Sequence, residues 1–481
     1  MADILIEGGI VLTMNPEWKV LGNGAVAVEG DRIVDVGETD ALKKKYPSPG
    51  KVIDARNKLV MPGLIDAHTH LHHSIIKGMT PGNYGYGTPW LVRIGQLYMK
   101  GQYTPERAYL AAMFSCAEAI RSGTTTLIEC GTPPGAEESH SRAIADSGIR
   151  GILGISAQDV FGPPGYTRPK EVIPVYGATP EENISRIEGV FQKYHNTADG
   201  RLGIWPSLFL VQNVSDRMCQ MGKEFADKHH VGMTTHANTM RPMVETCVQG
   251  WGKTPVMRLY DNGALGENVL LVHCGHMPGR DTMAVRETKT NLCHCVFTSM
   301  GMQYGACILN NFPGMLDMGI NIAIGTDGQT CCNHKDMVRV MNATFLVHKE
   351  VKFDCNLWPP KTVVEMATWN GAKALCLDKE IGSLEPGKKA DIILFDLTRP
   401  EWVPVHRYNL IENLVMSATG DSVDTSIING KVVMEGRVIK TFDMDRLVTE
   451  MQREGEAYSV AAATDFLGTE KPYPENMPPL W

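Results

Sequence analysis

Between residues 64 and 326, short apolar segments alternate with longer segments of helical pattern, and this alternation restricts the fold more than any other feature. Such a pattern is typical of βα units and a parallel sheet. Eight parallel strands can close into a (β/α)8 barrel. We therefore predict an α/β protein with a TIM-type barrel. Its strands are expected at residues 64–70, 124–130, 151–157, 202–208, 232–237, 269–273, 290–295 and 321–326.

The two ends of the chain have a different pattern, in which short strands are joined by tight turns. Hairpin signals lie at residues 29–31 near the start and at residues 429–430 near the end. We predict that both ends form one small β-sandwich domain around the barrel. The predicted boundaries are 1–60 for the first half of this domain, 61–380 for the barrel, 381–440 for the second half, and 441–481 for a C-terminal helix and tail.

Composition is typical of a globular enzyme. Hydrophobic residues make up 43% of the 481-residue chain and charged residues 21%, which is enough apolar surface for a packed core. The net charge of −8 argues against nucleic acid or an anionic membrane as a partner. The start of the chain lacks the pattern of a signal peptide, so we expect a cytoplasmic protein with reduced cysteines. The proline-rich tail suggests packing on a second subunit, hence a homo-oligomer.

Histidines and an aspartate recur where the predicted strands end. His68 and His70 end the first strand, His236 lies in the fifth, His273 ends the sixth, and Asp327 follows the eighth. Active sites of such barrels lie at the carboxyl ends of the strands. Side chains alternate along a strand, so His68 and His70 point to the same side. Nitrogen and oxygen donors of this kind bind zinc or another divalent first-row metal, and we predict a metal site.

With these residues the sequence resembles the amidohydrolase superfamily, in the branch that holds triazine hydrolases and guanine, cytosine and S-adenosylhomocysteine deaminases. The matching segments are residues 62–70, His236, 273–276, 325–328 and 382–391. The resemblance implies a metal held by His68, His70, His236 and Asp327, with His273 beside it. Zinc is the expected metal, and iron, cobalt and manganese are the alternatives.

The predicted fourth strand indicates a single metal. Members of the superfamily with two metals usually carry a carboxylated lysine at its end, whereas residues 202–208 contain no lysine. One divalent metal per chain is therefore expected, and it would lower the pKa of its bound water from about 16 to near 7. The resemblance further implies that Asp327 takes the proton of this water. His273 would orient the nucleophile or polarise the substrate.

One departure from the family pattern concerns the leaving group. Deaminases of this branch usually carry a glutamate three residues after the strand-five histidine, and that position is Thr239 here. A threonine hydroxyl cannot act as an acid near neutral pH. Either another group protonates the leaving atom or the leaving group needs no proton. The candidates for such a group are His273, His276, Glu129 and the nearby thiols.

A second departure places two thiols, Cys331 and Cys332, shortly after Asp327. They could line the pocket and favour a soft or apolar substrate. They could instead be small packing residues, and this is the interpretation that we favour. A zinc knot with Cys293 and Cys295 is a third interpretation, against which the Cys-x-Cys spacing argues.

The long segment that follows the first strand, residues 71–102, contains aromatic side chains suited to a flat heterocycle. Small-molecule pockets combine such apolar walls with a few polar groups. We therefore predict a heterocyclic small molecule as substrate. The predicted contacts are Tyr86, Trp90, Thr239, His276, Cys331 and Cys332.

Together these features predict a mononuclear metal-dependent hydrolase. It would use metal-bound hydroxide to displace an amino or comparable group from a nitrogen heterocycle, as an aminohydrolase of the cyclic amidine type. The alternative is a hydrolytic dechlorinase, or a C–S or C–N hydrolase of a urea- or thiocarbamate-like substrate. A third interpretation is a non-catalytic binding protein, against which the intact set of strand-end ligands argues.

Overall fold

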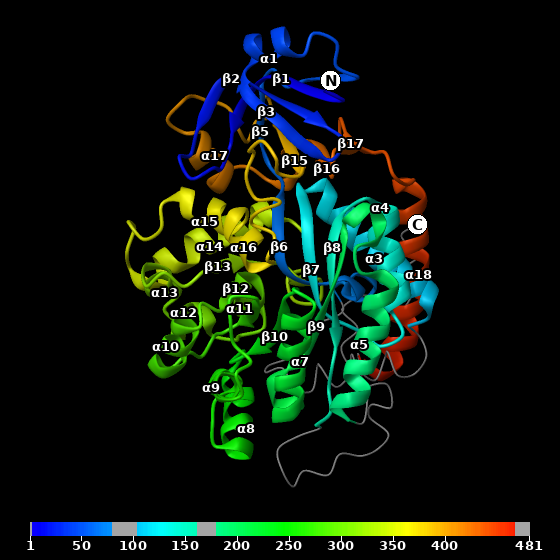
Figure 1. Cartoon of the computed structure of the whole chain (residues 1–481), viewed down its shortest axis with the longest axis vertical. Coiled ribbons are helices and arrows are strands. Elements are labelled where there is room, and N and C mark those ends of the chain that lie inside the picture. Colours follow the sequence, from blue (N-terminus) through cyan, green and yellow to red (C-terminus); the bar gives the residue numbers. More distant parts are fainter. Residues whose placement is uncertain (1, 79–102, 161–178, 467–481) are drawn as a thin grey trace.

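The computed structural model describes residues 2–78, 103–160 and 179–466. A barrel of parallel strands forms its centre, and a second nine-stranded sheet, called the small sheet because its domain is smaller than the barrel with its helices, lies at one end of the molecule (Figure 1). The barrel strands are β6 (Leu64–His70), β7 (Thr124–Thr132), β8 (Arg150–Ser156), β9 (Leu202–Leu210), β10 (Met233–Ala237), β11 (Val269–His273), β12 (Asn291–His294), β13 (Ile322–Ile324) and β14 (Asp327–Gly328).

The eighth barrel strand is split into β13 and β14, and this split closes the barrel. β13 pairs with β12, whereas β14 pairs with the first barrel strand, β6, and both pairings are parallel. The sheet order therefore returns to its starting strand. Each predicted strand is present, with ends that shift by a few residues at most, and the predicted barrel is confirmed.

Helices surround the barrel. Those that follow its strands are η1 (Leu71–Ile76), α3 (Pro105–Arg121), α4 (Glu137–Ser147), α5 (Pro180–Tyr194), α6 (Thr197–Gly200), η3 (Val211–Asn213), α7 (Asp216–Lys228), α8 (Arg241–Trp251), α9 (Pro255–Asp261), α10 (Gly279–Glu287), α11 (Val296–Gly301), α12 (Ala306–Leu309), α13 (Phe312–Asp317), α14 (Met337–Lys352), α15 (Pro360–Met366) and α16 (Trp369–Ala374). Two helix starts follow directly from local sequence. The Thr104 hydroxyl accepts from Arg107 N, and Thr179 and Glu182 form a complete capping box.

The small sheet draws its strands from both ends of the chain. They are β1 (Ile4–Leu12), β2 (Val20–Glu29), β3 (Arg32–Glu38), β4 (Lys51–Asp54), β5 (Lys58–Pro62), β15 (Ile392–Asp396), β16 (Val423–Ile428), β17 (Lys431–Glu435) and β18 (Val438–Ile439). Antiparallel pairing of β5 with β15 joins the two ends. The strands form one continuous mixed sheet of nine, not the two sheets of a sandwich. As expected, strands from both ends of the chain share one hydrophobic core.

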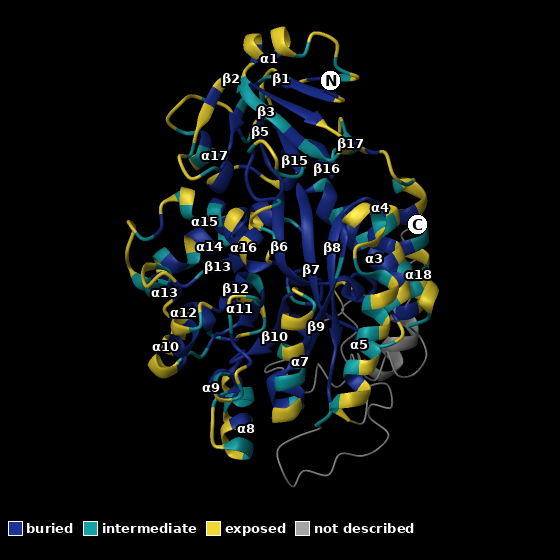
Figure 2. Cartoon of the chain, in the orientation of Figure 1, coloured by how far each residue is buried: buried dark blue, intermediate teal, exposed yellow. Residues whose placement is uncertain are grey.

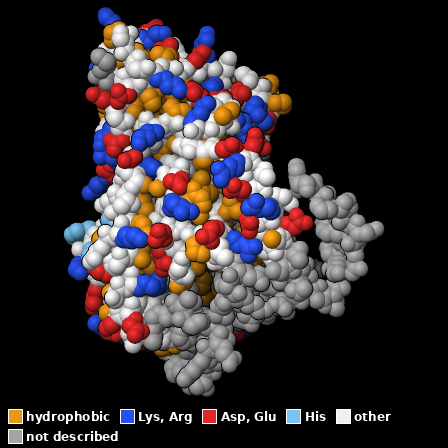
Figure 3. Space-filling view, turned by 90° about the vertical axis from the view of Figure 1, so that its right-hand side faces the viewer, with side chains coloured by type: hydrophobic (Ala, Val, Ile, Leu, Met, Phe, Trp, Pro, Cys, Tyr) orange, Lys and Arg blue, Asp and Glu red, His pale blue; other side chains and the backbone are white. Residues whose placement is uncertain are grey.

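The remaining helices are α1 (Thr39–Lys45), α17 (Leu410–Met416), η4 (Gly420–Ser422) and the long α18 (Met444–Phe466), which runs along the barrel (Figure 1). The barrel strands are buried, whereas exposed residues lie on the outer helices and turns (Figure 2). On the face shown in Figure 3, Lys and Arg side chains are intermixed with Asp and Glu side chains. A membrane span requires a long apolar helix, and no helix in the described ranges has this length and apolar character.

A buried ion pair connects the barrel to the small sheet. Arg150, the first residue of β8, donates from Nε to Asp391 Oδ2 at 2.8 Å and from Nη2 to Oδ1 at 3.0 Å. The same carboxylate accepts from Asn429 N at 2.8 Å. Asp391 is the last residue of the family-like segment 382–391, so this part of the motif has a structural role at the junction.

Replacing Asp391 by Asn should destabilise the fold by about 3–5 kcal/mol, because the Arg150 guanidinium would stay buried without its counter-charge. Urea unfolding followed by circular dichroism measures this loss. Asp54→Asn is the control, since its partner Arg56 is 78% exposed and such surface pairs contribute about 1 kcal/mol or less. Equal destabilisation by both substitutions would contradict the structural role of Asp391.

Candidate metal centre

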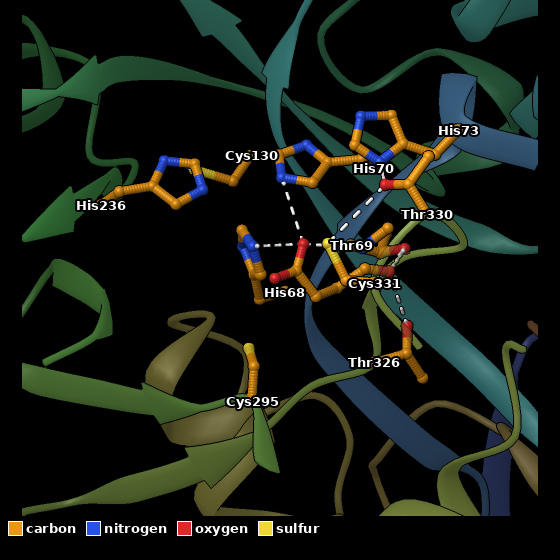
Figure 4. Close-up of polar contacts among 12 residues, drawn as sticks. His68, Thr69, His70, His73, Cys130, His236, Cys295, Thr326, Thr330 and Cys331 are labelled. Carbon is orange, nitrogen blue, oxygen red and sulfur yellow. Dashed lines mark hydrogen bonds and ion pairs between the residues drawn. The ribbon is translucent and has the colours of Figure 1, made fainter. Parts of the chain in front are cut away.

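Five side chains from four barrel strands, β6, β10, β11 and β14, converge at the carboxyl ends of the strands. His68 Nε2 and His70 Nε2 each lie 3.4 Å from Asp327 Oδ1. His273 Nε2 lies 3.7 Å from the other carboxylate oxygen, Oδ2. The ring centroids of His68 and His236 are 5.0 Å apart. The structure thus brings together the residues that the sequence selects, and Figure 4 shows His68, His70 and His236 around one point.

The histidine pair on β6 has the properties of metal ligands. His68 is fully buried, and neither of its ring nitrogens has a hydrogen-bond partner among the described residues; the same holds for Nδ1 of His70. Burying such atoms unpaired costs about 1–3 kcal/mol each. Ligands that share a tetrahedral zinc ion at about 2.0–2.2 Å lie about 3.3 Å from one another. The spacing of these side chains therefore fits a single divalent metal.

His236 is oriented by a neighbouring strand. Its Nδ1 donates to the carbonyl of Phe209 on β9 at 2.5 Å. A proton held on Nδ1 leaves the lone pair on Nε2, the usual arrangement of a metal-binding histidine. The ring of His236 stacks against that of His70 with 14° between the planes. This contact keeps His236 beside the other candidate ligands.

Cys130 at the end of β7 is a neighbour that sequence reasoning missed. Its Sγ lies 3.8 Å from His236 Nδ1, and one nitrogen of His68 also lies within 4.8 Å (Figure 4). Burial would raise the pKa of this thiol, but the His236 and His68 imidazoles outweigh burial and lower it to about 5. Side-chain alternation did not find it, because Glu129 is a candidate for the site and Cys130, the next residue, is therefore expected on the opposite side of the strand.

Several of the site residues adopt an unusual backbone conformation. The φ angles of His273, Cys274 and Asp327 are +71°, +46° and +63°. Non-glycine residues in this left-handed region cost about 1–3 kcal/mol each, and such residues cluster at active sites. Burial alone would raise the pKa of Asp327, but the neighbouring imidazoles, His68 first, hold it well below its usual range. The carboxylate is therefore ionised and faces the histidines.

A buried lysine supports the backbone of Asp327. Lys335 is 2% exposed, and its Nζ donates to the carbonyl oxygen of Asp327 and to Thr69 Oγ1. It also contacts Thr326 Oγ1 at 3.3 Å, and Thr326 N donates to Asp66 Oδ1 at 2.9 Å. These contacts hold Asp327 in its left-handed conformation. Sequence reasoning missed Lys335, because it lies outside any predicted strand end.

Glu129 is part of a separate buried network, so it is not free to donate a proton. Its carboxylate accepts from Leu71 N at 3.0 Å and Thr132 Oγ1 at 2.8 Å, and contacts Nδ1 of His140 at 2.7 Å and of His72 at 3.2 Å. Burial would raise the pKa of Glu129, but His140 and then His72 hold it well below its usual range. The carboxylate is therefore ionised and has partners on both oxygens, which argues against Glu129 as the proton donor.

Replacing Glu129 by Gln should destabilise the fold by about 3–5 kcal/mol, because a buried charge network loses its anion. Thermal and urea unfolding of the variant measures the change. Glu138→Gln removes an acid that is 75% exposed and pairs with Lys193, so it should cost about 1 kcal/mol or less. Wild-type stability of the Glu129 variant would contradict the network.

The predicted substrate contacts lie in different environments. Thr239 is buried in the loop after β10. His276 is half-buried, and its Nε2 donates to the carbonyl of Tyr304 at 3.0 Å, the residue whose ring packs against His273. Tyr86 and Trp90 lie outside the described residues.

The two cysteines after Asp327 differ from each other. Cys332 is buried, and its thiol donates to His334 O at 2.9 Å, which agrees with a packing residue. Cys331 is half-buried, and its pKa is raised well above the usual range by burial and by the charge of Asp327. The charge of Asp327 also raises the pKa of Cys332, so both thiols are linked electrostatically to the site. Figure 4 labels Cys331 near Thr330, whose hydroxyl lies 3.6 Å from its Sγ.

The four-cysteine zinc knot is not formed in the part of the chain that the structure describes. Cys293 and Cys295 approach to 4.0 Å between sulfurs. The potential ligand clusters group Cys295 with His68 and Asp327 instead, and none contains Cys331 or Cys332.

Comparison with known proteins agrees with this geometry. The model of the amidohydrolase family matches residues 59–433, which is most of the chain. The chain belongs to the amidohydrolase family. A short match to an imidazolonepropionase-like composite domain of bacteria covers residues 24–48. The predicted superfamily and the predicted class of enzyme, a metal-dependent hydrolase, are confirmed.

This amidohydrolase is similar over nearly its whole length to a curated relative and to solved structures. The 5-methylthioadenosine/S-adenosylhomocysteine deaminase of Thermoanaerobacter pseudethanolicus is 31% identical, with 94% of this chain and 99% of the relative covered. An adenosine deaminase from Xanthomonas campestris with bound zinc has a TM-score of 0.83 and 24% identity, covering 95% and 99% of the two chains.

A third similar protein is the atrazine chlorohydrolase of Arthrobacter aurescens TC1, whose structure contains zinc. Its TM-score is 0.83 at 22% identity, with 94% of this chain and 100% of that chain covered. At these identities the two solved structures show that the amidohydrolase has their fold.

Proposed function

We propose that this amidohydrolase is a mononuclear metal-dependent aminohydrolase that releases ammonia from an adenosine-like nucleoside. The observation that carries the proposal is the convergence of four histidines on the Asp327 carboxylate, with His68 buried and without a hydrogen-bond partner in the described ranges. The full-length similarity to a 5-methylthioadenosine/S-adenosylhomocysteine deaminase supports an adenine ring as the substrate group.

We propose that His68, His70, His236 and Asp327 hold one divalent ion, zinc, with iron, cobalt and manganese as alternatives. Strand β9 contains no lysine that could be carboxylated to bridge a second ion in this centre. The zinc in similar structures supports the choice of metal. When bound, such an ion acts as a Lewis acid and lowers the pKa of water.

The two oxygens of Asp327 have separate roles in this proposal. Oδ1 faces His68 and His70, so it is the ligand oxygen. Oδ2 lies on the side of His273, so it is the oxygen that accepts the proton of the attacking water. Burial lowers the pKa of His273 well below its usual range, so the ring is neutral. His273 then donates one hydrogen bond that orients water or polarises the substrate ring.

The identity of residue 239 supports a second candidate function. Its buried side chain stands where deaminases of this branch carry glutamate, and a hydroxyl does not supply a proton to a leaving amine. Chloride and thiolate leave without prior protonation. Thr239 therefore favours, as the alternative, hydrolytic dechlorination or cleavage of a C–S bond in a thiocarbamate-like substrate. A C–N hydrolase of a urea-like substrate belongs to the same alternative, but its leaving amine would still need a proton from another group.

We further propose that the substrate is a small heterocycle and that the enzyme is a cytoplasmic homo-oligomer. Light scattering after size-exclusion chromatography tests the oligomer.

A substrate panel tests the reaction. Ammonia release is measured with adenosine, 5′-methylthioadenosine and S-adenosylhomocysteine, and chloride or thiol release is measured with chloro- and methylthio-substituted triazines. Ammonia from the nucleosides supports the aminohydrolase, whereas chloride or thiol release alone supports the alternative.

Replacing Thr239 by Glu should raise the rate of ammonia release at least about tenfold over Thr239→Gln, because a positioned acid contributes about 10²–10⁴ in proton transfer. The glutamine variant is the matched control, since it has the same size and no acidic proton. Steady-state ammonia assays measure both. Equal rates in the two variants would show that position 239 has no part in protonating the leaving group.

A further inference from the structure

A second cluster of metal-binding side chains lies beside the barrel, with no residue in common with the candidate metal centre. His294 ends β12, Cys307 lies in α12, and His348 lies in α14. All three are buried, with exposed fractions of 1%, 4% and 0%. Their ligand atoms lie within 4.8 Å of one another. Three separate elements thus place donors at one point, on the α12 and α14 side of the barrel (Figure 1).

The distances within this cluster fit ligands of a common ion. His294 Nε2 lies 3.1 Å from His348 Nε2, and Cys307 Sγ lies 3.9 Å from His294 Nε2. Around a tetrahedral zinc ion, two histidine nitrogens lie about 3.3 Å apart, and a nitrogen and a thiolate sulfur about 3.6 Å. Small side-chain shifts therefore bring the three atoms into coordination.

We propose that His294, Cys307 and His348 bind a second metal ion, zinc or copper. Two imidazoles and a thiolate form a donor set that these thiophilic first-row metals favour. In the described residues the cluster supplies three protein ligands, and water completes a fourth position. The proposal does not depend on the proposed reaction, because none of the three residues takes part in it.

The two histidines of the cluster have protonation states that suit metal binding, whereas burial raises the pKa of Cys307, so this thiol loses its proton only to the ion. Burial lowers the pKa of His348 to about 4 and that of His294 well below its usual range, so both rings are neutral and can offer lone pairs. Their Nδ1 atoms have no hydrogen-bond partner in the described ranges. Without an ion, the Nε2–Nε2 contact is a hydrogen bond in which one Nε2 carries the proton, and metal binding requires that this proton move to Nδ1. The Cys307 thiol donates to Ser299 Oγ at 3.6 Å. Once the thiol is deprotonated, the same hydroxyl can donate to the sulfur and lower the pKa of the thiol.

Aromatic side chains enclose the two histidines. The Phe312 ring lies 4.2 Å from that of His294, and the Trp358 ring lies 4.8 Å from that of His348. An apolar shell of this kind limits the access of water to a metal site. An ion at this position would cross-link strand β12 to helices α12 and α14, which lie on either side of β14 in the sequence.

Metal analysis of four proteins tests the proposal: wild type, His68→Ala, His348→Gln and the double variant. After dialysis against zinc-containing and then metal-free buffer, zinc and copper are measured by mass spectrometry. We expect about two ions per chain in the wild type, about one in each single variant and none in the double variant. Cys219→Ser, which removes another buried thiol, is the control and should retain both ions.

Cobalt substitution gives a second measurement that needs no stable histidine variant. Cobalt bound at this cluster should produce a thiolate charge-transfer band in the near ultraviolet that is lost in Cys307→Ser and kept in Cys219→Ser. A wild type that holds one ion, lost entirely in His68→Ala, would overturn the second site. So would a metal content or cobalt band that is unchanged in both His348→Gln and Cys307→Ser.

Discussion

Asp327→Asn should lower kcat for ammonia release about 10²- to 10⁴-fold, the range that a positioned general base contributes. The amide keeps the size of the carboxylate and one oxygen for the ion, but it offers no group that can take a proton from water. The loss should therefore appear in kcat more than in KM. Steady-state kinetics, with the metal content of each preparation measured in parallel, separate loss of the base from loss of the ion.

Two outcomes decide the role of Asp327. Asp54→Asn, a substitution at an exposed carboxylate of β4, should leave kcat unchanged and serves as the control. If Asp327→Asn retains its metal and keeps kcat within about tenfold of wild type, another group is the base.

His68→Ala should remove the ion of the candidate metal centre and reduce ammonia release to background. His68 has no exposed surface, and its Nε2 lies 3.4 Å from Asp327 Oδ1, a spacing that a shared ion would satisfy. Losing one of four ligands lowers metal affinity strongly, and the affinity of such sites is part of the stability of the fold. Elemental analysis and thermal unfolding with and without added zinc measure both effects.

The control for this substitution is His406→Ala, which removes an exposed histidine that contacts Tyr408 N. It should leave metal content, activity and the response of the melting temperature to zinc unchanged. A His68→Ala protein that binds zinc with wild-type stoichiometry and remains active would contradict the ligand assignment.

The barrel could be predicted because its strands are short, apolar and separated by helix signals, which are local properties of the sequence. His68 and His70 could be paired for a similar reason, since alternation on one strand places both on the same side. The form of the small sheet could not be predicted, because pairing of β5 with β15 joins segments more than 300 residues apart.

The surroundings of the metal centre were less accessible to sequence reasoning. Lys335 reaches the backbone of Asp327 from the loop just before α14, and no spacing rule connects the two. Glu129 has the position of a catalytic acid along its strand, yet contacts with His72 and His140 make it a structural anion. His276 follows His273 closely in sequence, but its ring donates to a backbone carbonyl. For all three side chains, the hydrogen-bond partners are residues that are not neighbours in the sequence, so the sequence pattern does not reveal them.

The most direct test is a zinc titration of metal-free His348→Gln protein, in which the second cluster is removed. Ammonia release from 5′-methylthioadenosine or S-adenosylhomocysteine is followed as zinc is added. We predict that the rate rises linearly and saturates at about one equivalent per chain, and that the same titration of the His68→Ala, His348→Gln protein gives no rate. Saturation at about two equivalents, or ammonia release in the absence of metal, would contradict a mononuclear metal-dependent aminohydrolase.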